Sequence, residues 1–225
     1  MEELTLQAIG HVRSDFASKF AVPRQSGLVE ELTAEIIFEP PFRSADCLRG
    51  IEDYSHLWLL WHFSANRQEG WSPTVRPPRL GGNTRMGVFA TRSPYRPNPL
   101  GLSSVRLLEV LWDTPEGPVL RIGGADLMDG TPILDIKPYI ETDCHPDARC
   151  GFTDTVEKRR ARVDCPQELL DKLPEEKRAA LLGILAEDPR PAYQNDAERV
   201  YGFGFAEHEI RFRVSDGLRT VLDIL

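Results

Sequence analysis

The sequence has no long hydrophobic run, and its first residues do not resemble a leader. No stretch approaches the roughly 18 apolar residues of a membrane-spanning helix. The opening residues, MEELTLQ, lack the basic and apolar regions of a secretory signal peptide. We therefore expect a soluble, cytoplasmic protein that neither crosses a membrane nor is exported.

Cysteine is scarce, and no familiar catalytic motif is present. The four cysteines lack the closely spaced pairs of a structural zinc site, even around Cys144-His145 and Cys150, so we expect reduced thiols and no metal. The chain also has no P-loop, HExxH, GxSxG or strand–GxGxxG–helix sequence. These absences argue against P-loop enzymes, zinc proteases, α/β-hydrolases and dinucleotide-binding folds.

Positive charge is concentrated in one region of an acidic protein. The net charge of −8 argues against non-specific coating of DNA. Between Arg67 and Arg106, however, seven arginines stand against the single acid Glu69, a local balance of +6. A local basic patch is sufficient to engage phosphates, so a nucleic-acid substrate remains open.

The stretch from Trp71 to Ser104 combines this charge with stiffness. Its six prolines fix φ and push the preceding residues into extended conformations, so the region cannot be mostly helical. Residues Gly81 to Asn83 predict a tight turn, and Met86 to Ala90 predict a buried strand. The loop from Arg92 to Gly101 then presents two guanidiniums and an amide, as binding loops commonly do. A second such loop, Pro23-Arg24-Gln25, suits a carboxylate or a nucleobase edge.

Short strands separated by turn signals dominate the chain. The segment His56 to Phe63 is almost continuously apolar and aromatic, which predicts a central strand buried on both faces. In a strand from Ile133 to Ile140, the period of two places Asp135 and Lys137 on one face. Further strands are expected at Leu4–Val12, Ala34–Phe38, Val105–Leu111, Val119–Ala125 and Thr155–Val163. With little helix between them, this pattern predicts a mainly β protein built on a small antiparallel β-barrel.

The pattern changes near Asp164, where we expect a domain boundary. Residues 1–163 would form the barrel, and residues 164–225 a small α+β appendage. Acidic residues directly after Pro174 predict the start of a helix. Alternating residues around Asp216-Gly217 predict a final hairpin, and Asp188 to Tyr193 form a third stiff loop.

Seven motifs occur in order: PRQ at 23–25, SHLW at 55–58, PTVRPPRLGGN at 73–83, GVFATR at 87–92, RPNPLG at 96–101, DGTPILDIKPY at 129–139 and DPRPAY at 188–193. From about Ile9 to Val214, this set resembles the TrmO (YaeB/TsaA-like) family of tRNA methyltransferases. The resemblance implies a dimeric β-barrel that binds S-adenosylmethionine, with a C-terminal part that contacts tRNA. It also implies methyl transfer to N6 of threonylcarbamoyladenosine, adenine 37, immediately 3′ of the anticodon.

The cofactor contacts implied by this resemblance fit the chemistry of S-adenosylmethionine. Arg24 or Arg92 matches its carboxylate, and Asp126 or Asp129 matches its ribose hydroxyls or its ammonium. Gln25 and nearby backbone groups would hold the adenine. The implied cofactor-binding positions are Pro23, Arg24, Gln25, Phe63, Ser64, Arg92, Leu102, Asp126, Leu127, Met128 and Asp129. Family members carry a polar His-Gln or Asp-Gln pair after the phenylalanine, so a backbone contact is what we expect of Ser64.

Methyl transfer to an amide-like nitrogen needs positioning and a proton acceptor. Asp135 is our candidate acceptor and Asp129 the second, although Asp129 also fits a turn residue that caps its own backbone. We group Asn98 with these catalytic residues, because in a homodimer it and Arg96 would lie close to the partner's cofactor pocket. The expected substrate contacts are Arg96, Lys137, Tyr139, Arg190 and Tyr193.

Two other interpretations remain open. A non-catalytic RNA-binding barrel would use the arginine loop and aromatics such as Tyr95 and Tyr139, and would have no reason to bind S-adenosylmethionine. A methyltransferase with another acceptor would bind the cofactor without needing tRNA. The seven arginines favour a phosphate-bearing acceptor, for which KM depends on salt.

Overall fold

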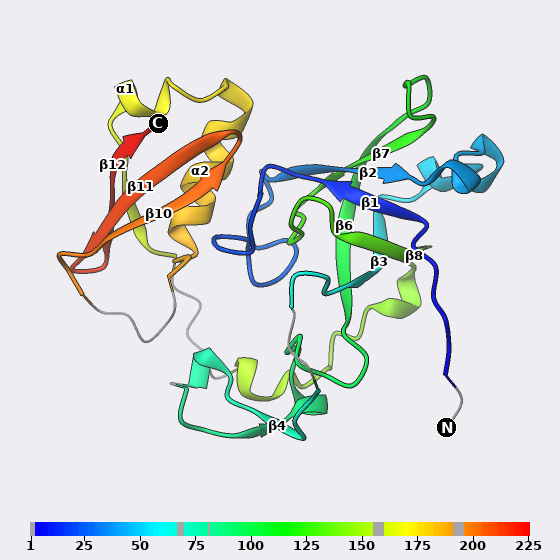
Figure 1. Ribbon diagram of the computed structural model, residues 1–225, viewed down its shortest axis with the longest axis horizontal. Coiled ribbons are helices and arrows are strands. Elements are labelled where there is room, and N and C mark those ends of the chain that lie inside the picture. The colour runs from blue at the N-terminus through cyan, green and yellow to red at the C-terminus, as the bar shows by residue number, and fades with distance from the viewer. Residues whose placement is uncertain (1–2, 67–69, 81, 155–159, 191–195) are drawn as a thin grey trace.

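Two β-rich bodies make up the computed structural model, which describes residues 3–66, 70–80, 82–154, 160–190 and 196–225 (Figure 1). The first is a ring of six antiparallel strands in the order β1-β2-β7-β6-β3-β8, closed by pairing of β8 with β1. Its strands are β1 Gly10–Arg13, β2 Thr33–Phe38, β3 His56–His62, β6 Leu100–Leu111, β7 Val119–Gly123 and β8 Pro132–Pro138. The predicted mainly β, barrel-based fold is therefore confirmed.

Alternation along the strands builds the core of this barrel. Leu57 and Leu59 of β3 are fully buried, as are Ile36 of β2 and Ile133 of β8. Trp58 and Leu60 lie on the other face and are partly exposed. The expectation that β3 is buried on both faces is wrong, because a closed barrel has only one inner face and its outer face here is not covered by helices.

The proline-rich stretch forms less regular structure than expected. The two-residue strands β4 Thr74–Val75 and β5 Met86–Gly87 pair with each other, and residues 88–90 turn into a 3-10 helix. Val88 is buried, but Phe89 is 75% exposed, so a buried strand through Ala90 is wrong. The predicted turn is present at Gly82 and Asn83, and Gly81 lies outside the described residues.

The C-terminal body is a four-stranded sheet packed with helices. Its elements are β9 Arg162–Asp164, α1 Gln167–Leu170, α2 Glu175–Ala186, β10 Val200–Phe205, β11 His208–Ser215 and β12 Leu218–Ile224. The sheet order is β10-β11-β12-β9, with β9 parallel to β12. The predicted helix start and final hairpin are confirmed, whereas β10 was not predicted. The expected strand Thr155–Val163 begins among residues outside the described ranges. No helix of the described ranges has the length and apolar character needed to span a bilayer.

The segment between β1 and β2 belongs to the core of the C-terminal body. Phe16, Val29 and Leu32 are buried in one cluster with Leu181 of α2 and Phe212 of β11. In Figure 1 this segment, in blue, extends from the barrel towards α2. The loop that carries the PRQ motif is therefore held by apolar anchors on both of its flanks.

Candidate functional site

Three of the predicted cofactor residues meet where β7 leaves the barrel. The Arg92 guanidinium donates a hydrogen bond through Nη1 to Oε1 of Gln25. The positive charge of Arg92 also acts on the carboxylate of Asp126, which is bonded in addition by the backbone of Ser26. Three loops that are far apart in the sequence thus bring a cation, an amide and an anion together.

Asp126 is held from inside the barrel by a buried hydroxyl. Ser103 of β6 is 1% exposed, and its Oγ donates to Oδ1 of Asp126 over 2.7 Å. The indole Nε1 of Trp61 donates in turn to this Oγ over 3.0 Å. Burial raises the pKa of Asp126, while the bond from Ser103 and the charge of Arg92 act in the opposite direction.

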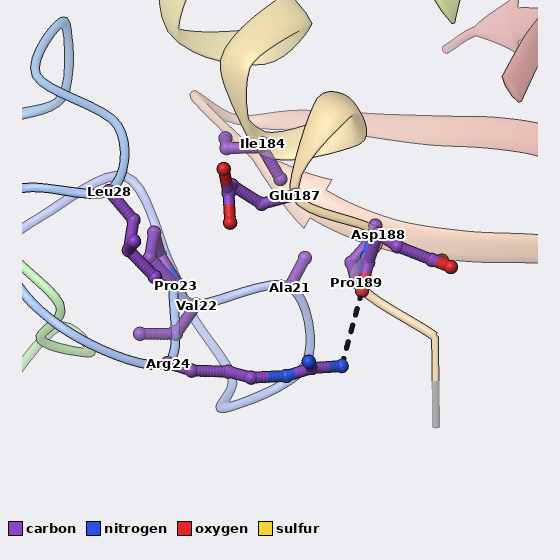
Figure 2. Close-up of a pocket in the computed structure, with 9 residues that line it drawn as sticks. All are labelled: Ala21, Val22, Pro23, Arg24, Leu28, Ile184, Glu187, Asp188 and Pro189. Atoms are coloured by element: carbon purple, nitrogen blue, oxygen red, sulfur yellow. Dashed lines mark hydrogen bonds between the residues drawn. The ribbon is translucent and has the colours of Figure 1, made fainter. Parts of the chain in front are cut away.

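Pro23 and Arg24 line a small pocket between the PRQ loop and the end of α2 (Figure 2). Nη2 of Arg24 lies 3.5 Å from the carbonyl oxygen of Asp188 and 3.4 Å from that of Arg190. Arg24 therefore joins the PRQ loop to the loop after α2. Of the two arginines proposed for the cofactor carboxylate, Arg92 is the one that lies with Gln25 and Asp126, which favours it for that role.

The residues after Asp126 fasten the segment that follows β1. Oδ1 of Asp129 accepts from the backbone N of Ser14 over 3.0 Å, and its own N donates to the carbonyl of Phe16. The carbonyl oxygen of Leu127 accepts from the Ser14 hydroxyl, and that of Met128 from Thr131. These bonds give Asp129 a structural role that differs from the expected capping of its own backbone, since its carboxylate binds the backbone of a distant segment. Its cofactor and catalytic roles, like the cofactor contacts of Leu127 and Met128, stay predictions.

Phe63 packs beside the same group, whereas Leu102 lies elsewhere. The Phe63 ring centroid is 4.2 Å from that of Trp61, and its backbone N donates to the carbonyl of Pro99. The backbone N of Ser64 is used in a bond to the His62 carbonyl. Leu102, 52% exposed, pairs with Leu60 on the outer face of the barrel. A cofactor that contacts both Leu102 and Asp126 would therefore have to cross the barrel rim.

The candidate proton acceptor Asp135 lies on the outer barrel wall. It pairs with Leu60 of β3, and its Oδ2 lies 3.2 Å from Nζ of Lys137, which confirms the expected shared face. The ring of Tyr139 lies 5.5 Å from that of Trp58 on the same wall. In the described ranges, no hydrogen bond or ion pair joins these residues to Arg92 or Asp126.

Arg96 lines a separate hollow of about 170 Å³. Its Nη1 donates to the Thr91 carbonyl, which fixes the loop, and the carbonyl oxygen of Asn98 accepts from the N of Leu100. The residues around the hollow are Asn66, Gly70, Trp71, Pro94, Tyr95, Arg96, Pro97 and Pro99. Aromatic rings beside a guanidinium suit the stacking of a base.

Arg190 is committed to an internal ion pair. Its Nε lies 2.9 Å from Oδ1 of Asp188, its guanidinium lies over the Tyr201 ring, and Arg219 bonds the same carboxylate. Although burial opposes it, these two arginines lower the pKa of Asp188. The side chain of Arg190 is only 12% exposed, which favours a structural role. Its predicted tRNA contact stays a prediction, and Tyr193 lies outside the described residues.

Sequence reasoning missed Ser103 and Trp61. The alternation of β6 contains a signal for the first, since Val105 points inward and Ser103 is two residues before it. Trp61 belongs to the apolar segment from His56 to Phe63, and nothing in that pattern indicates a partner for its indole N–H. No metal-binding group of three His, Cys, Asp or Glu side chains occurs within the ranges that the structure describes.

Comparison with known proteins relates the whole chain to one family. Residues 11–144 match the tRNA-methyltransferase O N-terminal domain, and residues 157–225 match the TrmO C-terminal domain. The chain is 42% identical to the tRNA (adenine(37)-N6)-methyltransferase of Escherichia coli K12, over 96% of this chain and 95% of that protein. It is 40% identical to the putative S-adenosylmethionine-dependent methyltransferase RcsF of Pseudomonas aeruginosa, over 88% of this chain and 87% of that protein.

A solved structure extends this similarity to the fold. The crystal structure of TrmO from Pseudomonas aeruginosa superposes with a TM-score of 0.79 and 31% identity, covering 100% of both chains. The family matches, the relatives and the barrel all agree, and the protein is therefore a member of the TrmO family of methyltransferases.

Proposed function

We propose that this protein transfers a methyl group from S-adenosylmethionine to N6 of adenine 37 in tRNA, with threonylcarbamoyladenosine as the acceptor. The observation that carries the proposal is the grouping of Arg92, Gln25 and Asp126. A guanidinium suits the carboxylate of the methyl donor, and a carboxylate suits its ammonium. The name of the 42% identical Escherichia coli relative supports the same acceptor.

These three side chains fit S-adenosylmethionine, which supplies an electrophilic methyl group on a sulfonium when bound. Arg92 and Asp126 would bind opposite charges of the amino-acid part, and Gln25 would contact the adenine edge. The Phe63 and Trp61 rings pack with centroids 4.2 Å apart, and Trp61 is linked to Asp126 through the Ser103 hydroxyl. Because the reaction develops little charge, this positioning accounts for most of the rate enhancement expected.

The acceptor nitrogen must also lose a proton. We retain Asp135 as the candidate that receives it, with Asp129 second. Asp135 lies on the outer barrel wall, with its Oδ2 3.2 Å from Nζ of Lys137. The aromatic pair Trp58 and Tyr139 on the same wall would suit an unstacked base.

The acceptor is tested by two measurements on one protein. Nucleosides from a host that lacks this protein should lose the N6-methyl form of threonylcarbamoyladenosine and accumulate the unmethylated form. The purified protein should restore the methyl group on tRNA from that host. Cofactor binding without methyl transfer to tRNA would favour another acceptor. Binding of RNA without any affinity for S-adenosylmethionine would favour the non-catalytic barrel.

We expect tRNA binding to rest on the basic stretch around Arg92 and Arg96, with help from the C-terminal body. KM for tRNA should therefore rise steeply between low and physiological salt, because phosphate contacts release counterions. KM for the methyl donor should change little. Because tRNA serves translation, we also propose that the protein acts in the cytoplasm.

A homodimer with shared sites is part of the proposal. Two inactive chains, Asp135→Asn and Asn98→Ala, should regain part of the activity when mixed, because one of the two hybrid sites would be intact. The measurement is methyl transfer after subunit exchange has been verified with two differently tagged chains. Persistent inactivity despite exchange would mean that each barrel works alone.

Catalysis should not require a metal ion. Methyl transfer from a sulfonium needs no Lewis acid, so EDTA should leave the initial rate within about twofold of the untreated rate, as positioning alone predicts. The assay should use tRNA refolded before the chelator is added. Activity that EDTA abolishes and zinc restores, with tRNA structure unchanged, would contradict this expectation.

A further inference from the structure

A buried serine donates a hydrogen bond to the carboxylate at the centre of the proposed cofactor site. Ser103 lies on the inner face of β6, opposite Leu59 of β3, and is 1% exposed. Its hydroxyl oxygen contacts Trp61 on one side and Asp126 on the other. A hydroxyl placed inside an apolar barrel must satisfy its hydrogen bonds there, and these two bonds do so.

The direction of the two bonds follows from the chemistry of the groups. An indole N–H can only donate, so Ser103 Oγ must accept from Trp61. The serine has a single proton, and a carboxylate accepts it at 2.7 Å. Trp61 therefore orients the hydroxyl, and Ser103 donates to the carboxylate form of Asp126.

The hydrogen bond from Ser103 opposes the effect of burial on the pKa of Asp126. Burial raises the pKa of Asp126, and the bond from Ser103 opposes that rise together with backbone bonds and the charge of Arg92. Arg92 is the charged side chain that acts on Asp126 from the neighbouring loop, and Ser26 contacts it through the backbone. A carboxylate that is half-buried needs such donors to stay ionised near neutral pH.

We propose that Ser103, oriented by Trp61, is a positioning residue that keeps Asp126 anionic and aimed at the ammonium of the methyl donor. The inference rests on the proposed function. Ser103 need not touch the donor itself, since its hydroxyl is used by Trp61 and Asp126. Its contribution should appear as cofactor affinity and as the pH at which that affinity is lost.

The test is calorimetry with S-adenosylmethionine alone, in a pH series that runs from neutral pH downwards until the wild-type affinity is lost. Ser103→Ala should weaken binding about tenfold at neutral pH, the usual effect of removing a hydrogen bond to a charged group. The acidic loss of affinity should begin at a higher pH than in the wild type, because the donor that lowered the pKa is gone. Trp61→Phe should move both quantities in the same direction by a smaller factor.

Three controls separate this role from general damage. Ser104→Ala removes the neighbouring hydroxyl, which lies on the other face of β6 opposite Trp58, and should change neither quantity. Ser103→Thr keeps the donor and should restore the wild-type pH midpoint. Methylthioadenosine, which lacks the amino-acid part, should bind Ser103→Ala as well as it binds the wild type.

The outcomes distinguish the two levels of the proposal. A wild-type protein without affinity for S-adenosylmethionine would overturn the proposed function itself. Wild-type binding with unchanged affinity and pH midpoint in both Ser103→Ala and Trp61→Phe would overturn only the role of Ser103. An equal loss for methylthioadenosine would overturn the assignment to the ammonium. Thermal melts identify any variant that fails to fold. If Ser103→Ala does not fold, the affinity and the pH midpoint of Trp61→Phe decide whether Ser103 has the proposed role.

Discussion

Replacing Asp126 by asparagine is expected to weaken binding of S-adenosylmethionine roughly thirtyfold, about 2 kcal/mol, since one partner of a half-buried charge pair is lost. Asparagine has nearly the same shape, so Ser103 and the Ser26 backbone still find an acceptor. The loss should therefore be one of charge and not of packing. Calorimetry at neutral pH measures it directly.

Asp126→Asn should also differ from the wild type in how its affinity for S-adenosylmethionine depends on pH. Because burial raises the pKa of Asp126, the wild-type carboxylate takes up a proton at a higher pH than an ordinary aspartate. Wild-type affinity should thus fall as the pH drops through that pKa, whereas Asp126→Asn should show no such step. Asp113→Asn, in the exposed turn before β7, is the matched control and should behave as the wild type. An unchanged affinity in Asp126→Asn would remove this carboxylate from the site.

The second large effect is expected from Gly101→Ala. A Cβ at this position would lie 2.2 Å from Cε2 of Trp61, far inside van der Waals contact. The indole has little room to retreat, since it packs on Phe63 and is bonded to Ser103. Overpacking of this kind costs about 1–3 kcal/mol of unfolding free energy. Any shift of the ring also takes its N–H away from Ser103, so cofactor affinity should fall together with stability.

Urea unfolding and cofactor calorimetry on the same preparation measure both losses. Gly87→Ala is the matched control, because an added Cβ there meets nothing within 4 Å and its φ of −57° suits alanine. In a Trp61→Leu background, Gly101→Ala should cost much less, which is a double-mutant test of the contact. A full cost in that background would mean that Trp61 is not the obstacle.

The elements with a clear local signal were predictable. Proline and acidic residues mark the start of α2, and Asp216-Gly217 adopts the left-handed φ values of 49° and 77° that a tight hairpin needs. The strand β10 was missed although Tyr201, Phe203 and Phe205 alternate, because Gly202 and Gly204 weaken the propensity between them. Local pattern also failed after Gly87, where a 3-10 helix replaces the expected strand.

The structure brings together three residues that the sequence singled out, but it joins them through contacts that the sequence did not indicate. Gln25 and Arg92 lie in the motifs and Asp126 was implied by the family resemblance, and their cofactor role stays a prediction. Nothing local indicated that Asp126 would be bonded by Ser103, which is 23 positions away and inside the barrel. Nor did the sequence indicate that Asp188 would bind Arg219, which is 31 positions away. Residues that only the tertiary fold brings together cannot be paired from their spacing along the chain.

The anchoring of residues 16–32 in the C-terminal core limits how the chain can be divided. A fragment ending at residue 163 would leave Phe16, Val29 and Leu32 without the apolar partners that now bury them. The PRQ loop between these residues would no longer be fixed by packing on both sides, and Arg24 would lose its contacts to the loop after α2. Deleting the C-terminal body to isolate the barrel would thus also damage the proposed cofactor site. A chimaera that exchanges this body for another must carry a matching stretch between β1 and β2.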